Sequence, residues 1–316
     1  MEILKTLFLG IIQGLTEFLP VSSSGHLIIA ETFMGKGSED MLLEVVLHVA
    51  TGIAVLFVFR KDIINIIRGC FSKDTAERKD SLYYSGWVIL ATIPAALVGI
   101  LFKKQIDALF DTSDGNTTAA YIASCMLFVT AALLIFSSRG KNGVNANGVN
   151  TGNPNANSAF CVNIGGMTTV RALLIGITQA IAIMPGISRS GSTIAVALML
   201  SVSREEAGRF SFMLALPAIF GAALLDARKI LKSDSLHAVL TPDLAVGFIA
   251  SLVVGVIALK FLLTFIKKGK LHYFGYYCAI AAVVSLTALT FRGTPTDGNG
   301  NAVEADPIPT VLSDTN

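Results

Sequence analysis

Charged residues are scarce in this sequence. Asp, Glu, Lys and Arg make up 15% of its 316 residues, whereas 53% are hydrophobic. A soluble globular domain carries about 25% charged residues. The scarcity therefore excludes an ordinary soluble domain and predicts an all-α polytopic membrane protein surrounded by membrane lipids.

Cysteines and basic clusters are also few. The four cysteines, Cys70, Cys125, Cys161 and Cys278, show no paired spacing, which argues against a disulfide framework or a thiolate metal cluster. The net charge is +2, and no basic stretch is interleaved with aromatic residues. We therefore expect no nucleic-acid partner.

Long apolar runs, in contrast, are abundant. A helix needs about 20 predominantly apolar residues to cross the hydrocarbon core of a bilayer. Six segments are long and apolar enough to predict transmembrane helices: 43–59, 86–102, 119–137, 210–227, 244–266 and 273–291.

Two further apolar stretches, 2–30 and 170–200, are interrupted near the middle by Pro, Gly, Ser and charged residues. Each half is too short to cross a bilayer, so the pattern predicts two re-entrant helix–turn–helix hairpins. Irregular backbone at membrane depth is tolerated only where it is buried in protein or lines a wet cavity. Both turns are therefore candidates for one shared site.

The two hairpins correspond to each other at a shift of 166 residues, which superimposes Gly10 on Gly176, Gln13 on Gln179 and Gly25 on Gly191. Three spans follow each hairpin. Because three is odd, the second half enters the membrane from the opposite face, which predicts an inverted-topology repeat.

This repeat sets the expected organisation of one integral membrane domain. Repeat 1 covers 1–137, an Asn- and Gly-rich linker covers 138–169, repeat 2 covers 170–291, and a polar tail covers 292–316. Lys and Arg number 14 on the face that holds the 60–85 loop and 8 on the other. Basic residues favour the cytoplasmic face, so we expect both termini outside.

The second turn, PGISRSGST at 185–193, has the chemistry of an anion site. Ser188, Ser190 and Thr193 offer hydroxyls, and Arg189 adds a planar fork of donors that matches phosphate oxygens. The half-helix that leaves the turn directs free N–H groups and its positive dipole end toward the same place. An arginine at membrane depth is itself a sign of a functional site.

The first turn joins Glu17 to His26 through Ser22, Ser23 and Ser24. A carboxylate, a hydroxyl and an imidazole this close in sequence are the components of an activated nucleophile or an acid–base pair. The serines also suit a simpler role, because serine often caps the start of a helix.

Other roles stay open at this stage. Glu17 suits a divalent cation that bridges phosphate oxygens, with Gln13 on the same helix face as a second ligand. A purely structural alternative pairs Arg189 with Glu17. Glu44 and His48, at the start of a span, either line the cavity or cap a helix.

The repeat makes the two turns similar in shape and different in chemistry. At the shift of 166 residues, Ser23 falls opposite Arg189 and Glu17 falls opposite Ile183. One turn can bring acid, base and nucleophile, and the other an anion clamp. Phosphoryl transfer requires this division, because charge on the phosphate must be neutralised while a nucleophile attacks in line.

These motifs resemble those of the BacA/UppP family of bacterial undecaprenyl-diphosphatases. The family's first signature, Glu or Gln followed four residues later by Glu, is present as Gln13 and Glu17. Its second, Pro-Gly-x-Ser-Arg-Ser-x-x-Thr, is matched throughout 185–193, and its histidine is present as His26. The resemblance covers about residues 1–291.

The resemblance implies hydrolysis of undecaprenyl diphosphate to undecaprenyl phosphate and inorganic phosphate. This reaction recycles the lipid carrier for peptidoglycan synthesis and confers resistance to bacitracin, which sequesters the diphosphate. The resemblance also implies a divalent cation, Mg²⁺ or Ca²⁺. It further implies a place in the bacterial cell membrane, with the site open toward the outer face.

The resemblance and the turn chemistry together select the site residues. The expected catalytic residues are Glu17, Ser23, His26 and Arg189. The residues expected to bind the diphosphate are Ser22, Ser24, Ser188, Arg189, Ser190 and Thr193. The nucleophile is either Ser23 or a water, and His26 moves the proton. Some family members have glutamate at position 13, so a cation here depends on Glu17 more than on Gln13.

A transporter is the alternative function. Inverted repeats with broken helices at the midplane also build secondary carriers, so the protein could instead flip a polyprenyl phosphate across the bilayer. Phosphate release by the purified protein distinguishes an enzyme from a carrier. The sequence leaves open whether the protein forms a homodimer.

Overall fold

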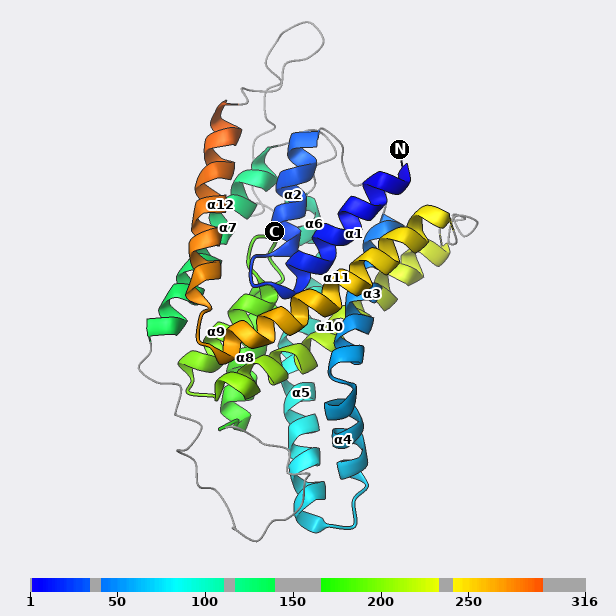
Figure 1. Cartoon of the computed structure of the whole chain (residues 1–316), viewed down its shortest axis with the longest axis vertical. Coiled ribbons are helices and arrows are strands. Elements are labelled where there is room, and N and C mark those ends of the chain that lie inside the picture. Colours follow the sequence, from blue (N-terminus) through cyan, green and yellow to red (C-terminus); the bar gives the residue numbers. More distant parts are fainter. Residues whose placement is uncertain (1, 35–40, 111–116, 140–165, 233–240, 292–316) are drawn as a thin grey trace, which may run out of the picture.

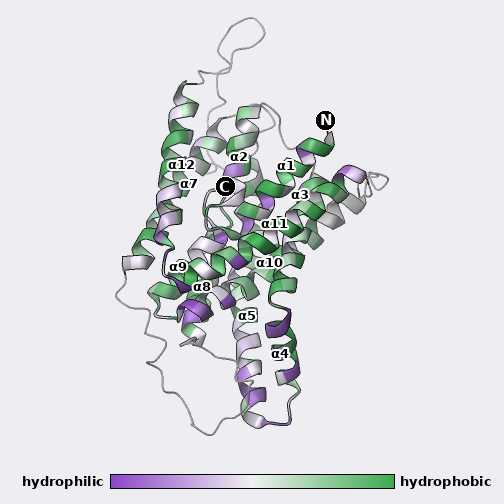
Figure 2. Cartoon of the chain, in the orientation of Figure 1, coloured by the Kyte–Doolittle hydropathy of each residue, from purple (hydrophilic) through white to green (hydrophobic). Residues whose placement is uncertain are grey.

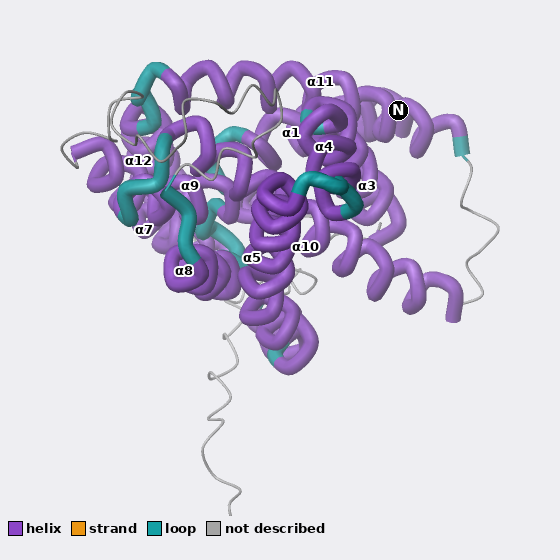
Figure 3. The backbone as a smooth tube through the Cα atoms, turned by 90° about the horizontal axis from the view of Figure 1, so that it is seen from below, coloured by secondary structure: helices purple, strands orange, loops and turns teal. Residues whose placement is uncertain are grey.

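The computed structural model describes residues 2–34, 41–110, 117–139, 166–232 and 241–291. Every regular element within these ranges is a helix, as Figures 1 and 3 show from two directions. The expected linker falls mostly, and the polar tail entirely, outside the described residues, so those two predictions stay predictions.

Within the described ranges, five helices are long and apolar enough to cross a membrane: α5 (Thr75–Leu101), α7 (Thr118–Arg139), α10 (Arg204–Lys232), α11 (Pro242–Lys267) and α12 (His272–Phe291). A sixth span is possible only as a bent pair, α3 (Met41–Val58) and α4 (Arg60–Cys70), which meet at 69°. Each of the six predicted spans falls on one of these elements. The structure thus confirms a helical, polytopic membrane protein with five or six candidate spans.

The structure adds helix where the sequence predicted a loop. Residues 60–70 form α4, and α5 begins at Thr75, well before its expected start; a short α6 (Lys103–Leu109) follows α5. The Asp74 side chain caps α5 by accepting the N–H of Ala76. Hydrophilic residues gather on α4 and on the adjoining end of α5 (Figure 2), which explains why hydropathy alone missed this helical extension.

Each interrupted stretch is a pair of short helices joined by a turn. The first pair is α1 (Glu2–Phe18) and α2 (Ser23–Met34), and the second is α8 (Thr169–Ile181) and α9 (Arg189–Met199). Their breaks fall at the two serine-rich turns. Both pairs end within a few residues of the limits expected from the sequence.

Two glycines at equivalent positions set the packing of the two pairs. α1 packs on α11, and α8 packs on α5. A Cβ added at Gly10 would collide with the backbone of Gly247, and one added at Gly176 would collide with the backbone of Ala91. Each short helix therefore lies directly against the backbone of a long one, which leaves no room for a side chain at the glycine.

An aromatic cluster lies in the core next to the first turn. The Phe212 ring packs against Phe18 and Phe59, each with ring centroids 5.9 Å apart. Tyr84 of α5 packs edge-on against Phe210 of α10, and both rings are fully buried. Rings in such contacts add about 0.5–1.5 kcal/mol each beyond their burial, so this cluster gives the end of α1 a rigid support.

Candidate active site between the two broken helices

The first turn is tight and partly left-handed. Ser22 has φ +68°, which a residue other than glycine rarely adopts. The Ser22 hydroxyl accepts the N–H of Gly25 at 3.3 Å, and α2 begins at the next residue, Ser23. Ser22 therefore caps α2, which is the simpler of the two roles that the sequence allowed for this serine. Ser22 also lines the cavity described below.

The second turn is capped in the same way and held by a neighbouring helix. The Ser188 hydroxyl accepts the N–H of Gly191 at 3.1 Å, which caps α9. Thr130 of α7 donates its hydroxyl to the carbonyl of Gly186 and accepts the N–H of Ser188. Because these groups are buried, Thr130 fixes the turn through two bonds that water does not compete for.

The two turns touch each other directly. A Cβ added at Gly25 would lie 2.8 Å from the Cα of Gly186, so the backbones of the two turns are in direct contact there. The Ser190 hydroxyl also donates to the carbonyl of Phe18 across the same junction, at 3.1 Å. Residues 172 positions apart are thereby joined into one site.

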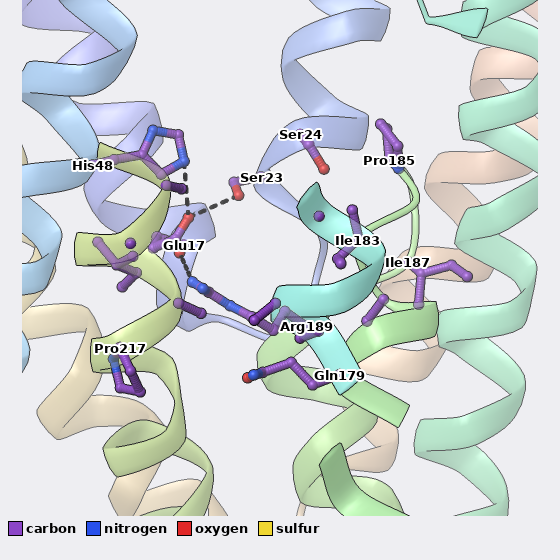
Figure 4. A pocket seen from close by; sticks show the side chains of 18 of the residues that line it. Glu17, Ser23, Ser24, His48, Gln179, Ile183, Pro185, Ile187, Arg189 and Pro217 are labelled. Carbon is purple, nitrogen blue, oxygen red and sulfur yellow. Dashed lines mark hydrogen bonds and ion pairs between the residues drawn. The ribbon is translucent and has the colours of Figure 1, made fainter. Parts of the chain in front are cut away.

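Glu17 lies at the centre of this site (Figure 4). Its Oε1 forms an ion pair with Nη2 of Arg189. Its Oε2 accepts from the Ser23 hydroxyl at 3.0 Å and from the Gln13 amide at 3.1 Å, and it lies 3.8 Å from Nε2 of His48. The Glu17 side chain is only 5% exposed, whereas that of Arg189 is 25% exposed and accessible to a ligand.

A cavity of about 600 Å³ opens beside this ion pair. This volume is within the range of small-molecule sites, about 300–1,000 Å³. The expected site residues that line it are Glu17, Ser22, Ser23, Ser24, Ser188 and Arg189. The structure thus brings the carboxylate, the hydroxyls and the guanidinium to one place, from two segments far apart in the sequence.

Four expected residues are absent from the cavity lining that the structure describes. Gln13 donates to Glu17, Ser190 bonds to the first turn, and the Thr193 hydroxyl donates to the carbonyl of Arg189. His26 bonds through Nδ1 to the carbonyl of Ser22, and its Nε2 lies 3.0 Å from the Tyr277 hydroxyl. None of the four is among the described residues that line the cavity.

Among the other polar residues that line the cavity, His48 and Gln179 bear most directly on its chemistry. His48, for which the sequence left two roles open, points its Nε2 toward Glu17, because Nδ1 bonds to the carbonyl of Glu44. Gln179 is 1% exposed, and both polar atoms of its amide lack a hydrogen-bond partner. The repeat register contained the signal, since Gln179 occupies the position of Gln13 in the second half.

The cavity offers limited support for a metal ion. The described residues contain no group of three His, Cys, Asp or Glu side chains that could hold one. Glu17 is the only carboxylate among the described lining residues, and Gln13 Oε1 is buried without a partner. Mg²⁺ is often held by one or two carboxylates together with substrate phosphates. The residues therefore fit a cation that shares its ligands with a phosphate, and not one that the protein holds alone.

The fold and the site together define a class of protein. It is a helical membrane protein in which two pairs of short helices bring a carboxylate, hydroxyls and a guanidinium to the wall of one cavity. A protein-family model described as "Bacitracin resistance protein BacA" matches residues 6–284. The chain belongs to this family.

Relatives named undecaprenyl-diphosphatase are similar over nearly their whole length. The one from Bacteroides fragilis is 39% identical over 288 residues, which cover 90% of this chain and 98% of the relative. The one from Parabacteroides distasonis is 39% identical over 291 residues, covering 91% and 98%. The one from Korarchaeum cryptofilum is 36% identical over 295 residues, covering 92% and 100%.

Proposed function

We propose that this protein hydrolyses undecaprenyl diphosphate to undecaprenyl phosphate and inorganic phosphate. Its family and the names of its relatives support this activity. The reaction recycles the lipid carrier of peptidoglycan synthesis, and the description of the family connects it with bacitracin resistance. The protein is a membrane-bound phosphatase on this proposal.

One observation carries the proposal. Arg189 comes from one broken helix and Glu17 with Ser23 from the other, and the three meet at the wall of a single cavity. The guanidinium can bind phosphate oxygens, and the Ser23 hydroxyl already donates to a carboxylate that can orient it. Positive charge and a held nucleophile are the two requirements of phosphoryl transfer.

The second turn binds the diphosphate in this mechanism. Arg189 is released from Glu17 in part and donates to the phosphate oxygens, and the N–H groups at the start of α9 lie at the positive end of its dipole. Ser188 and Gln179 complete this wall. The Gln179 amide is buried without a protein partner, which costs free energy unless a ligand satisfies it.

The first turn carries out the attack. Glu17 orients the nucleophile, either the Ser23 hydroxyl or a water in its place, toward the terminal phosphorus. The new P–O bond forms as the anhydride bond breaks, and undecaprenyl phosphate leaves with the electron pair. If water attacks, this step gives inorganic phosphate directly. If Ser23 attacks, a water then hydrolyses the phosphoserine ester, which releases inorganic phosphate and restores the hydroxyl. His48 is better placed to accept the proton than His26, because His48 lines the cavity whereas His26 faces Tyr277. A cation held by Glu17 and the diphosphate would supply further charge neutralisation.

The topology is part of the same proposal. The two broken helices are re-entrant hairpins, the halves form an inverted repeat, both termini lie outside, and the cavity opens toward the outer face of a bacterial cell membrane. Packing supports the repeat, since α1 on α11 mirrors α8 on α5, and α7 packs on its own counterpart α12. A homodimer stays a prediction, which the mass of the protein in detergent would test.

Phosphate release by the purified protein in detergent tests the function. We expect release from undecaprenyl diphosphate by the wild type, strong loss in Glu17→Ala and Arg189→Ala, and a decrease with chelator that added Mg²⁺ or Ca²⁺ reverses. Transport of the lipid in vesicles without phosphate release would contradict the proposal and favour a carrier.

A further inference from the structure

Most glycines within the described helices are closely surrounded by other atoms, but three have open space where a side chain would be. A Cβ added at Gly14, for example, would approach the backbone of Ser251 to 2.7 Å. At Gly86, Gly99 and Gly221, in contrast, an added Cβ would meet nothing within 4 Å. None of these three glycines has a positive φ that would exclude other residues.

A glycine without a packing role weakens its helix. Glycine in a helix interior is about 1 kcal/mol less favourable than alanine. Gly221 lies in the middle of α10, and Gly99 lies in the last turn of α5. Both line the cavity, whereas Gly86 does not. The open space beside Gly99 and Gly221 is therefore part of the cavity, and Gly221 lies at its exposed edge.

Small residues from two helices line this part of the cavity. On α5 they are Ala95, Ala96 and Gly99, and on α10 they are Ala218, Gly221 and Ala222. The α5 residues recur at the spacing of one helix face. Together they form an apolar slot between α5 and α10, which we call the α5–α10 slot.

The slot connects the polar site to the outer surface of the protein. Its inner end is continuous with Glu17 and Arg189 in the same cavity. At its outer end Ile100 and Leu224, which are 68% and 65% exposed, line the cavity too. On a protein with five or six candidate spans, such exposed apolar side chains face lipid.

The volume limits what the slot can hold. A cavity of about 600 Å³ must take the diphosphate as well as part of the lipid chain. Sites of this size enclose drug-sized ligands, about 300–1,000 Å³, and a 55-carbon chain is much larger. Only the part of the chain next to the diphosphate can lie inside.

We propose that the α5–α10 slot binds the isoprene units next to the diphosphate, and that the rest of the chain stays in the lipid. This inference rests on the proposed function and names the part of the substrate that the protein reads. Gly99 and Gly221 are substrate-binding positions on this proposal, because their missing side chains make room for the chain. Hydrolysis is then independent of chain length beyond the units that the slot encloses.

Leucine substitutions test the slot. Gly99→Leu and Gly221→Leu are compared with Gly86→Leu, a matched change on α5 at a glycine with the same open surroundings outside the cavity. Each is assayed for phosphate release from C55 and C15 prenyl diphosphates in detergent. One methylene in an apolar pocket changes kcat/KM by about 10- to 200-fold, so we expect at least a tenfold loss for both slot variants on both substrates and little change for Gly86→Leu.

Milder variants guard against misfolding. Alanine favours the helix, so we expect the thermal midpoint of Gly99→Ala and Gly221→Ala to be unchanged or higher than that of the wild type. Alanine also fills less of the slot than leucine does, so the increase in KM should be smaller than in the leucine variants. Full activity of the folded slot variants, or an equal loss in Gly86→Leu, would overturn the slot. A wild type that hydrolyses the C55 substrate at least tenfold faster than the C15 substrate would also overturn it. No phosphate release from either substrate by the wild type would instead refute the proposed function.

Discussion

The two serine-rich turns share one frame and differ in the residues they present. Gly10 and Gly176 bring their helices against a neighbouring backbone in the same way, and Ser22 and Ser188 cap the return helices with the same bond. Where the first turn has Glu17, the second has an isoleucine. Two turns with the same backbone support and the same cap can thus carry different side chains into one site.

Removing the charges that differ between the turns has the largest expected effect. Arg189→Ala should lower kcat/KM by about a hundred- to a thousandfold, since it removes the donor that neutralises charge in the transition state. Glu17→Ala should cause a similar loss. Arg189→Lys keeps the charge without the planar fork and serves as the control. Activity in Arg189→Ala near that of the wild type would show that the ion pair is only structural.

The shared frame can be broken at either of two equivalent glycines. Gly10→Leu and Gly176→Leu each force a side chain into backbone. Overpacking costs about 1–3 kcal/mol and occasionally more, so we expect a clear decrease in thermal midpoint in detergent for both. Gly86→Leu, at a position where an added Cβ meets nothing within 4 Å, controls for the added bulk. A decrease in only one half would show that the two hairpins are not equivalent supports.

The two glutamines that the repeat superimposes should separate into different kinetic roles. Gln179→Leu removes a buried amide that faces the cavity, so we expect KM to rise about tenfold. Gln13→Leu removes the amide that holds Glu17, so we expect mainly kcat to fall. Steady-state kinetics of both variants checks this division. An increase in KM alone in Gln13→Leu would contradict it.

The smallest expected effect concerns the two capping serines. Ser188→Ala should lower the stability by about 1 kcal/mol, whereas Ser188→Gly should cost only a few tenths. Both variants lack the hydroxyl. An equal loss of activity in the two would show that the hydroxyl binds the ligand. A loss in Ser188→Ala alone would show that the hydroxyl acts as the helix cap. The same pair at Ser22 sharpens the comparison, because glycine there also relieves the left-handed backbone.

The sequence predicted the spans, the positions of the helix breaks and the encounter of Arg189 with Glu17. These follow from the length of apolar runs, from Pro and Gly at the turns, and from a repeat register without gaps. Their common basis is local pattern, which a single sequence displays directly.

Which histidine reaches the cavity depends on how each helix is rotated about its axis. His26 is one turn from Ser23, yet its ring stacks on Tyr277, with centroids 5.7 Å apart, and turns from the cavity. His48 comes from a different element and reaches Glu17. Spacing does not determine which side of a helix faces a partner that is distant in the sequence. Residues 60–70 were missed because an amphipathic helix with many charged residues has a low mean hydropathy, as a loop does.

The resting ion pair has a consequence for turnover. A guanidinium that already faces Glu17 gains little by exchanging that partner for a small, doubly charged product. A ligand that also fills the apolar part of the cavity gains further binding free energy, and only such a ligand displaces the carboxylate favourably. We therefore expect the enzyme to release inorganic phosphate readily, so that inhibition by this product is weak. The lipid monophosphate should compete with the substrate more effectively.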